Sequence, residues 1–293
     1  MDRRSFLKLA GFIPAAALFG CSGTGQEKPQ KNASKEEKKS EPVAVRVATL
    51  KGPTAMGLVK FISDVEAQNI TDNNYSFEIL DAPDQVVAKV AQGDVDVASI
   101  PANLAATLFN KTKGAYKVAC LNVLNVLYIV ETGNAISKFA DLKGKTLYAS
   151  GKGAVPEYAL SYLLSKNGMT LGEDVQVEWK SEHTECVAAL AQDSEGIALL
   201  PQPFVTVAQT KNSQIRAAID LGAEWEAINP QSKLIAGVTI ISSKLISDSP
   251  DAVTALLSHY KDSVEFAVDH PDDAATLVGK YGIVPEPIAK VAL

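Results

Sequence analysis

The stretch that decides the fold is Gln92-Gly93-Asp94-Val95-Asp96-Val97-Ala98-Ser99-Ile100-Pro101-Ala102-Asn103. Apolar residues at helical spacing precede this stretch and end at Gly93, which suits the left-handed residue that follows a helix. A short buried strand is predicted over residues 95–100, and Pro101 ends it because proline has no N–H to donate to a sheet. A second helix is predicted over residues 102–109. This order of elements is typical of a βα unit in an α/β protein.

The carboxyl end of this strand is the first candidate binding site, because ligands of open α/β sheets lie at that edge. Ser99 at the strand tip and Asn103 in the first turn of the helix are the candidate contacts. The alternative is a buried βα unit without a ligand. Asp94 and Asp96 are interpreted as turn formers, as carboxylates beside glycine usually are.

The composition describes a globular chain that is large enough for two lobes. It has 293 residues, 46% of them hydrophobic and 21% charged, and a formal net charge of -6. Residues 1–20 carry three cations and one anion, so their removal leaves a still more acidic chain. An acidic surface argues against nucleic acid as a partner, because phosphate binding needs clustered Lys and Arg.

The amino terminus is interpreted as an export signal over residues 1–20. Arg3-Arg4-Ser5-Phe6-Leu7-Lys8 precedes an apolar stretch, residues 9–19, that is too short to span a bilayer permanently. The paired arginines resemble the signal read by the twin-arginine export route.

A lipid anchor and a tether are expected next. Leu18-Phe19-Gly20-Cys21 resembles a lipobox, in which cleavage leaves Cys21 as the lipidated first residue. The alternative is a structural cysteine beside an ordinary cleavage site. Residues 21–42 are too polar to bury a core, and such a flexible tether would span about 25 Å.

Two helix starts are candidate sites for an anion. A strand predicted over residues 43–50 leads through Lys51 into a helix with Thr54 as its N-cap. Gly151-Lys152-Gly153-Ala154-Val155-Pro156 repeats this arrangement further along the chain. Because the free N–H groups of a helix start attract anions, the two sites could clamp one ligand. Ordinary capped βα turns are the alternative.

Three further polar residues are candidates for other reasons. Asn122 and Asn125 interrupt the apolar run 116–130, where buried amides need partners. A ligand or a bend in the strand would supply them. Gln202 follows a predicted strand and lies between two prolines that fix its backbone.

The cysteines and histidines do not indicate a metal site. Cys120 and Cys186 are expected to be unpaired thiols, and a disulfide between them, which export from the cytoplasm would permit, is the alternative. His183 and Cys186 have the spacing of half a zinc site, but no second pair completes it. No metal and no cofactor are therefore expected.

Taken together, the segment 93–101, the turn Asp141-Leu142-Lys143-Gly144-Lys145 and the lipobox resemble those of bacterial solute-binding lipoproteins. The chain is most similar to the group of ABC importers that bind nitrate, sulfonate, taurine and thiamine precursors. This resemblance implies an α/β, two-lobe periplasmic binding protein-like (type II) fold with two interlobe crossings and a central ligand cleft. We expect lobe 1 to comprise residues 43–131 plus 235–293, and lobe 2 residues 132–234.

The resemblance also implies which residues contact the ligand. The family's binding positions fall on Lys51, Thr54, Ala55, Met56, Ser99, Asn103, Gly153, Ala154, Val155 and Gln202. The last of these stands where the family often has an acidic or aromatic contact, so a cationic ligand would lack a counter-charge.

The expected function is capture of a small anionic or polar organic solute, such as a sulfonate, a carboxylate or a pyrimidine-like compound. The implied partners are an ABC permease and its ATPase, and the membrane through lipid on Cys21, with the protein monomeric and extracytoplasmic. An enzyme on the same fold, of the pyrimidine-precursor or menaquinone-pathway type, is one alternative, and a sensory binding subunit is another.

Overall fold

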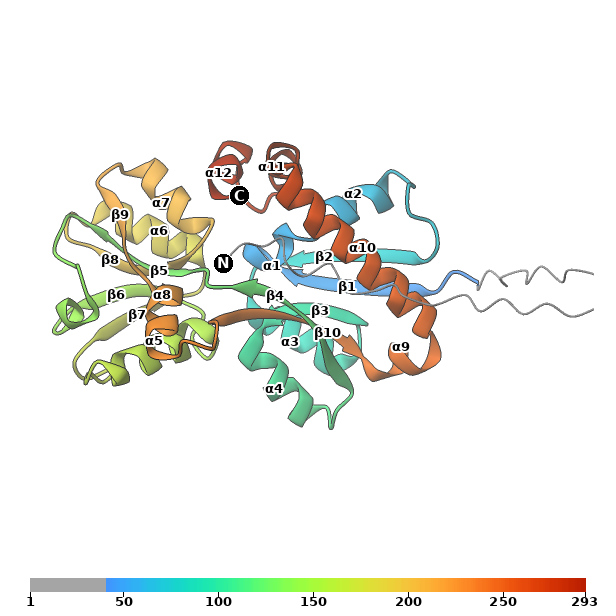
Figure 1. The fold of residues 1–293 in the computed structure, drawn as a ribbon, viewed down its shortest axis with the longest axis horizontal. Coiled ribbons are helices and arrows are strands. Elements are labelled where there is room, and N and C mark those ends of the chain that lie inside the picture. Colours follow the sequence, from blue (N-terminus) through green and yellow to red (C-terminus); the bar gives the residue numbers. More distant parts are fainter. Residues whose placement is uncertain (1–40) are drawn as a thin grey trace, which may run out of the picture. The chain divides into compact units, whose positions relative to one another are not determined.

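The computed structural model describes residues 41–293, which form one compact unit (Figure 1). The predicted signal peptide, the lipobox with Cys21 and all of the tether except its last two residues lie outside the described residues.

Two five-stranded sheets organise this unit. Sheet A has the order β2-β1-β3-β10-β4, and sheet B has the order β7-β6-β8-β5-β9. In sheet A, β10 runs antiparallel to both neighbours, and in sheet B, β5 does the same. The repeated order, with one reversed strand in each sheet, gives the two-lobe type II arrangement that the sequence predicts.

The first lobe is built on sheet A and its helices. Its elements are β1 (Ala44–Leu50), α1 (Pro53–Met56), α2 (Val59–Glu66), β2 (Asn74–Leu80), α3 (Pro83–Gln92), β3 (Val97–Pro101), α4 (Ala102–Lys111), β4 (Tyr116–Leu124), β10 (Ile235–Ser242), α9 (Ser243–Asp248) and α10 (Pro250–Asp269). Gly93 closes α3 with a left-handed φ of 75°, as predicted.

The second lobe is built on sheet B. Its elements are β5 (Leu127–Thr132), the 3-10 helix η1 (Phe139–Leu142), β6 (Thr146–Ser150), α5 (Val155–Lys166), β7 (Gln176–Lys180), α6 (His183–Gln192), β8 (Ile197–Pro201), α7 (Phe204–Lys211), β9 (Ile215–Asp220) and α8 (Leu221–Ile228). Leu160, Leu163 and Leu164 of α5 are completely buried in its core. Each such side chain contributes about 1.5–3 kcal/mol when it leaves water.

The chain crosses between the sheets twice, and the crossings are bonded to each other. Asn125 has a left-handed φ of 48° and ends the run of sheet A. Its backbone N–H donates to the Leu234 carbonyl at 3.0 Å, and its Oδ1 accepts from the Leu234 N–H at 3.0 Å. The backbone of Leu234 is therefore a hydrogen-bond partner of Asn125. Of the two explanations considered for this amide, a ligand or a bend in the strand, the structure has the bend.

The first crossing lies earlier than the sequence predicts. We placed the change of lobe at residues 131–133, where the apolar run breaks. β5 pairs with β8 from Leu127 onward, so the chain changes sheet at Asn125 and Val126. The physical reason is that the bend at Asn125 is made within the apolar run and leaves its hydrophobicity uninterrupted.

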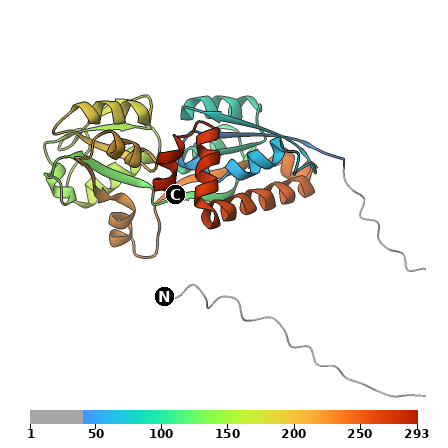
Figure 2. The same ribbon diagram turned by 90° about the horizontal axis from the view of Figure 1, so that it is seen from above.

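Two C-terminal helices, α11 (Pro271–Lys280) and α12 (Glu286–Ala292), pack on both lobes. α11 contacts α2 and α10, and α12 contacts α7 of the second lobe (Figures 1 and 2). One apolar cluster joins Ala55 and Val59 of the first lobe, Phe204 of the second and Ile288 of α12. The end of the chain thus links the two lobes.

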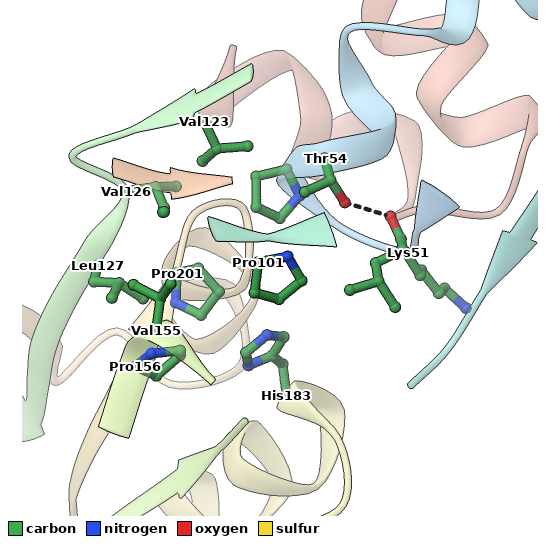
Figure 3. A pocket seen from close by; sticks show the side chains of 13 residues that line it. Lys51, Thr54, Pro101, Val123, Val126, Leu127, Val155, Pro156, His183 and Pro201 are labelled. Carbon is green, nitrogen blue, oxygen red and sulfur yellow. Dashed lines mark hydrogen bonds between the residues drawn. The ribbon is translucent and has the colours of Figure 1, made fainter. Parts of the chain in front are cut away.

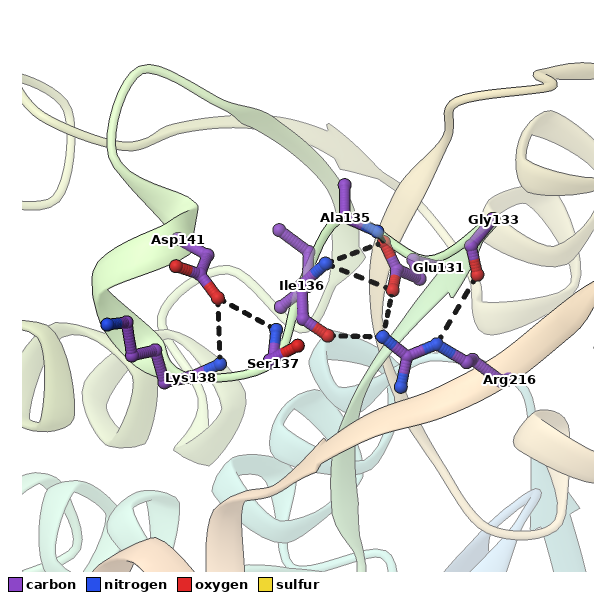
Figure 4. Close-up of polar contacts among 8 residues, drawn as sticks. All are labelled: Glu131, Gly133, Ala135, Ile136, Ser137, Lys138, Asp141 and Arg216. Carbon is purple, nitrogen blue, oxygen red and sulfur yellow. Dashed lines mark hydrogen bonds and ion pairs between the residues drawn. The ribbon is translucent and has the colours of Figure 1, made fainter.

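A buried ion pair fixes the start of the second lobe. Glu131 is 1% exposed and pairs with Arg216 of β9. Its carboxylate also accepts from the N–H groups of Ala135 and Ile136 (Figure 4). Beside it, Asp141 accepts from the N–H of Ser137 at 2.8 Å, and this bond lowers the pKa of Asp141.

Local details differ from the predictions in two places. Thr54 does not cap its helix, because Pro53 already begins α1 and Gly52 is the N-cap. The short elements η1, α8 and α9 lack a long apolar period and were not predicted. Cys120 and Cys186 are free thiols, as expected, and burial raises the pKa of Cys186 to about 12.

Candidate binding site between the two lobes

A cavity of about 80 Å³ lies where the strand ends of both sheets meet (Figure 3). The first lobe supplies Leu50, Lys51, Pro53, Thr54, Pro101, Val123 and Ala236 to its wall. The residues of the second lobe and of the first crossing are Val126, Leu127, Val155, Pro156, His183 and Pro201. The wall is predominantly apolar, and its only polar side chains are those of Lys51, Thr54 and His183.

The wall follows directly from the βα order of each sheet. Leu50, Pro101 and Pro201 are the last residues of β1, β3 and β8. Val155 and His183 are the first residues of α5 and α6. Because the carboxyl ends of parallel strands meet at one edge of a sheet, these residues converge although they are distant in sequence.

His183 is the titratable side chain most enclosed by the site. Its Nδ1 lies 2.6 Å from Ser150 Oγ, and its ring packs on Phe204 with centroids 4.9 Å apart. Burial lowers the pKa of His183 to about 4. The imidazole is therefore neutral at pH 7, with Nε2 as the ring nitrogen that remains for a solute.

Lys51 and Thr54 lie in the wall as predicted, but both are engaged. Thr54 Oγ1 donates to the Leu50 carbonyl at 2.8 Å (Figure 3). Lys51 Nζ lies 3.6 Å from Asp81, and its chain extends away from the other wall residues in the figure. The neighbouring Ala55 is fully buried in the interlobe cluster, and Met56 packs against that cluster.

Of the three residues predicted to contact the ligand at the second helix start, only Val155 reaches the wall, beside its neighbour Pro156. The Gly153 N–H donates to the Glu157 carboxylate at 2.6 Å, and the Ala154 N–H donates to the Gly151 carbonyl at 3.0 Å. The chain's own acceptors thus take the two amides that we assigned to an anion. The anion pocket expected there is filled from within the helix.

Asn103 joins the two lobes. Its Nδ2 donates to the Gly153 carbonyl at 2.8 Å, and its Oδ1 is buried with no partner among the described residues. The residue is two positions beyond Pro101 in sequence and is not itself part of the cavity wall.

Ser99 and Asn122 belong to a polar cluster inside the first lobe. Ser99 is fully buried, and its Oγ lies 3.0 Å from Thr239 Oγ1. It faces a separate cavity of about 10 Å³ beside Tyr260. Asn122 Nδ2 donates to the same threonine at 3.1 Å, while its Oδ1 is buried without a partner in the described chain.

Gln202 serves the helix that follows it. Its Oε1 accepts from Thr206 Oγ1 at 3.0 Å and from the Thr206 N–H at 3.3 Å. The wall residue at this strand tip is Pro201, its neighbour.

Sequence reasoning missed ten wall residues, namely Leu50, Pro53, Pro101, Val123, Val126, Leu127, Pro156, His183, Pro201 and Ala236. Nine of the ten are apolar, and nothing in a sequence separates an apolar wall residue from a core residue. His183 carried a signal, because it opens a helix after the strand at residues 175–179, in the position that Val155 has after its strand.

Residues 41–293 hold no group of three His, Cys, Asp or Glu side chains placed to bind a metal ion. In the same part of the chain, the helices fall short of the length and hydrophobicity that crossing a bilayer requires.

Comparisons with known proteins place the fold and the family. The sequence model of the NMT1/THI5-like family matches residues 72–274, more than half of the chain. A search of curated proteins gives no match.

Solved structures share the architecture at low sequence identity. The periplasmic aliphatic sulphonate-binding protein SsuA from Escherichia coli has a TM-score of 0.69 at 17% identity, over 85% of this chain and 78% of that one. The alkanesulfonate-binding protein SsuA from Xanthomonas axonopodis pv. citri, bound to MOPS, has a TM-score of 0.67 at 18% identity. The match covers 86% of this chain and 84% of that one. The periplasmic nitrate-binding protein NrtA from Synechocystis PCC 6803 has a TM-score of 0.65 at 13% identity. The match covers 85% of this chain and 69% of that one. The chain belongs to the NMT1/THI5-like family and has the two-lobe, type II fold of periplasmic binding proteins.

Proposed function

We propose that the protein is the extracytoplasmic solute-binding subunit of an ABC importer. It captures a small organic solute between its lobes and delivers it to a membrane permease that an ATPase drives. The observation that carries this proposal is the cavity whose wall is drawn from the strand ends of both sheets.

The contacts around the cavity support a binding cycle in which the lobes close on the solute. Asn103 of the first lobe donates a hydrogen bond to the Gly153 carbonyl of the second. A solute that touches Thr54 on one side and Val155 on the other would add to this contact and favour the closed arrangement. The similar folds of the sulfonate- and nitrate-binding proteins agree with such a role.

The proposed location of the protein outside the membrane is inferred from its amino-terminal sequence. We propose that residues 1–20 direct export, that Cys21 carries lipid, and that the following tether holds a monomeric body at the outer face of the membrane. These features come from the sequence pattern alone.

Catalysis is not part of the proposal. The wall of the cavity contains no carboxylate, and the hydrogen-bond partner of His183 is Ser150. With a pKa of about 4, His183 is a weak base at neutral pH, whereas general bases are tuned close to the working pH.

A thermal-shift screen of the full chain tests the proposal. The screen should contain sulfonates, carboxylates, pyrimidines and neutral amides, with mass spectrometry to check that the bound compound is recovered unchanged. A solute at 100 times its Kd stabilises the protein by about 2.7 kcal/mol. Recovery of a converted compound would favour an enzyme.

A pair of matched variants locates the binding. Val155→Glu introduces a longer, charged side chain into the wall at the first residue of α5, where it would obstruct a solute. Val118→Glu makes the same change at a site in β4 that is 54% exposed. We expect the first variant to fold and to lose the solute-induced shift, and the second to keep it. Retention of the shift in both folded variants, or no shift with any compound, would refute the proposal.

A further inference from the structure

We infer that the solute is uncharged: a small, largely apolar molecule with one or two N–H or O–H groups, and not a sulfonate, carboxylate or other anion. The inference rests on the proposed function and names the solute class of that same cavity. Three observations support it. Prolines stand at two helix starts, amides before the second helix start are already hydrogen-bonded within the chain, and the polar atoms that remain are mostly acceptors.

Prolines stand at the helix starts where an anion would seek donors. Pro53 is the first residue of α1, and Pro156 is the second residue of α5. Both side chains line the cavity. A proline has no N–H, so each removes one of the free donors that make a helix start attractive to an anion. The rings also add apolar surface at those points.

Two donors just before the second helix start, the N–H groups of Gly153 and Ala154, are satisfied by the chain itself. Glu157 accepts from the Gly153 N–H at 2.6 Å, so a carboxylate already occupies the position of an anion. A solute anion brought to the same turn would meet this negative charge. Like charges at close range in a partly desolvated site repel strongly.

The wall holds one cation, and that cation is paired. Lys51 Nζ lies 3.6 Å from the Asp81 carboxylate, and the Lys51 side chain is 37% exposed. His183 adds no positive charge at neutral pH, because its imidazole is neutral. Transfer of an unpaired anion into such a wall would be unfavourable, since burial of a charge requires a partner.

The polar atoms that remain are acceptors or neutral. Thr54 Oγ1 donates its hydrogen bond to the Leu50 carbonyl, so only its lone pairs are available to a solute. His183 Nε2 belongs to a neutral ring that can accept or donate. The two buried side-chain polar atoms without partners in residues 41–293 are Asn103 Oδ1 and Asn122 Oδ1, and both are acceptors. Neither residue lines the cavity, but their near neighbours in sequence, Pro101 and Val123, do. This set favours a solute that donates hydrogen bonds.

The size of the cavity limits the solute. Its volume of about 80 Å³ is smaller than the roughly 150 Å³ of a cavity that holds benzene. A compound of a few heavy atoms fits the closed arrangement.

Shape-matched compounds test charge and donors separately on the full chain. Isobutyramide, isobutyrate and 3-methylbutan-2-one share one shape, and differ in carrying an N–H donor, a negative charge or neither. Methanesulfonamide and methanesulfonate form a second pair. Calorimetry at pH 7 should give the amide a Kd at least about tenfold lower than that of the carboxylate, with the ketone between them. The sulfonamide should likewise bind more tightly than the sulfonate.

A gain-of-function variant provides the complementary test. Pro156→Ala restores a backbone N–H at the second residue of α5, and methanesulfonate should bind about tenfold more tightly to it than to the unaltered protein. Pro271→Ala makes the same change at the start of α11, away from the cavity, and should have no effect on binding.

Tighter binding of the anionic member of either set would overturn the inference and leave the proposed function standing. Equal binding of the ketone and the amide would overturn the assignment of donor groups. If every matched compound fails while another member of the wider screen binds in a manner that Val155→Glu abolishes, the solute class is wrong and the function stands. If nothing in the wider screen binds, the proposed function falls.

Discussion

Asn103 donates its side-chain amide to the carbonyl of Gly153 at 2.8 Å, across the gap between the two lobes. Both residues were predicted to contact the ligand, and in the structure they contact each other. Both residues lie two positions in sequence from residues of the cavity wall, Pro101 and Val155. The bond therefore connects the stability of the closed arrangement to the capture of a solute.

Loss of this bond should weaken solute binding. Asn103→Ala removes a hydrogen bond whose net contribution is about 1 kcal/mol, so the apparent affinity for a solute should fall about fivefold. Asn110→Ala, an exposed asparagine on the same helix, is the control. Titration calorimetry compares the two variants, and equal affinities would show that this hydrogen bond does not contribute.

His183 should make the protein sensitive to acid. Its pKa is about 4 in the folded protein and 6.5 in an unfolded chain, so protonation favours unfolding. The stability is present in full above pH 6.5 and is lost as the pH falls towards 4. Between pH 7 and pH 4.5, the free energy of unfolding should fall by about 2 kcal/mol less in His183→Gln than in the unaltered protein.

Urea unfolding at the two pH values measures this difference. The exposed His270 supplies the matched variant His270→Gln, which should follow the unaltered protein. A pH dependence that His183→Gln leaves unchanged would mean that the buried ring does not titrate as described.

Gly237 should not tolerate a side chain. A Cβ at this position would lie 2.5 Å from Asn122 Oδ1 and 3.1 Å from the Thr54 methyl carbon. Gly237→Ala should destabilise the protein by about 1–3 kcal/mol, the usual cost of overpacking. Asn122→Ala in the same chain removes the clash, so the double variant should regain part of the loss. Strict additivity in a double-mutant cycle would exclude this contact as the cause.

The buried ion pair of the second lobe should matter far more than an exposed one. Glu131→Ala removes the carboxylate partner of Arg216 and the acceptor of two backbone N–H groups, and should cost about 3–5 kcal/mol. Glu265→Ala breaks an exposed pair with Lys261 and should cost under about 1 kcal/mol. Similar unfolding free energies for the two variants would contradict the role given to Glu131.

The sequence was sufficient to predict most of the order of strands and helices, with the short elements η1, α8 and α9 missed. Gly93, Pro101 and Pro156 mark real boundaries, because glycine and proline act through local backbone geometry. The family resemblance then supplied the two-lobe arrangement. The first crossing was misplaced because the bend at Asn125 depends on Leu234, a partner far away in the sequence.

The site was predicted less completely than the fold. Lys51, Thr54 and Val155 do line the cavity, since each follows or precedes a strand end. The helix start at Gly153 looked like an anion site because its glycines and proline were interpreted as a turn with free amides. Whether an amide is free depends on where the Glu157 carboxylate folds, and the sequence pattern does not fix that.

The most direct measurement is hydrogen exchange of the full chain, with and without the solute that raises the unfolding temperature most. Our account predicts slower amide exchange in two separate segments, residues 50–57 of the first lobe and residues 151–158 of the second. Slower exchange in one lobe only, or at a distant surface such as the one around Arg46, would contradict capture between the lobes.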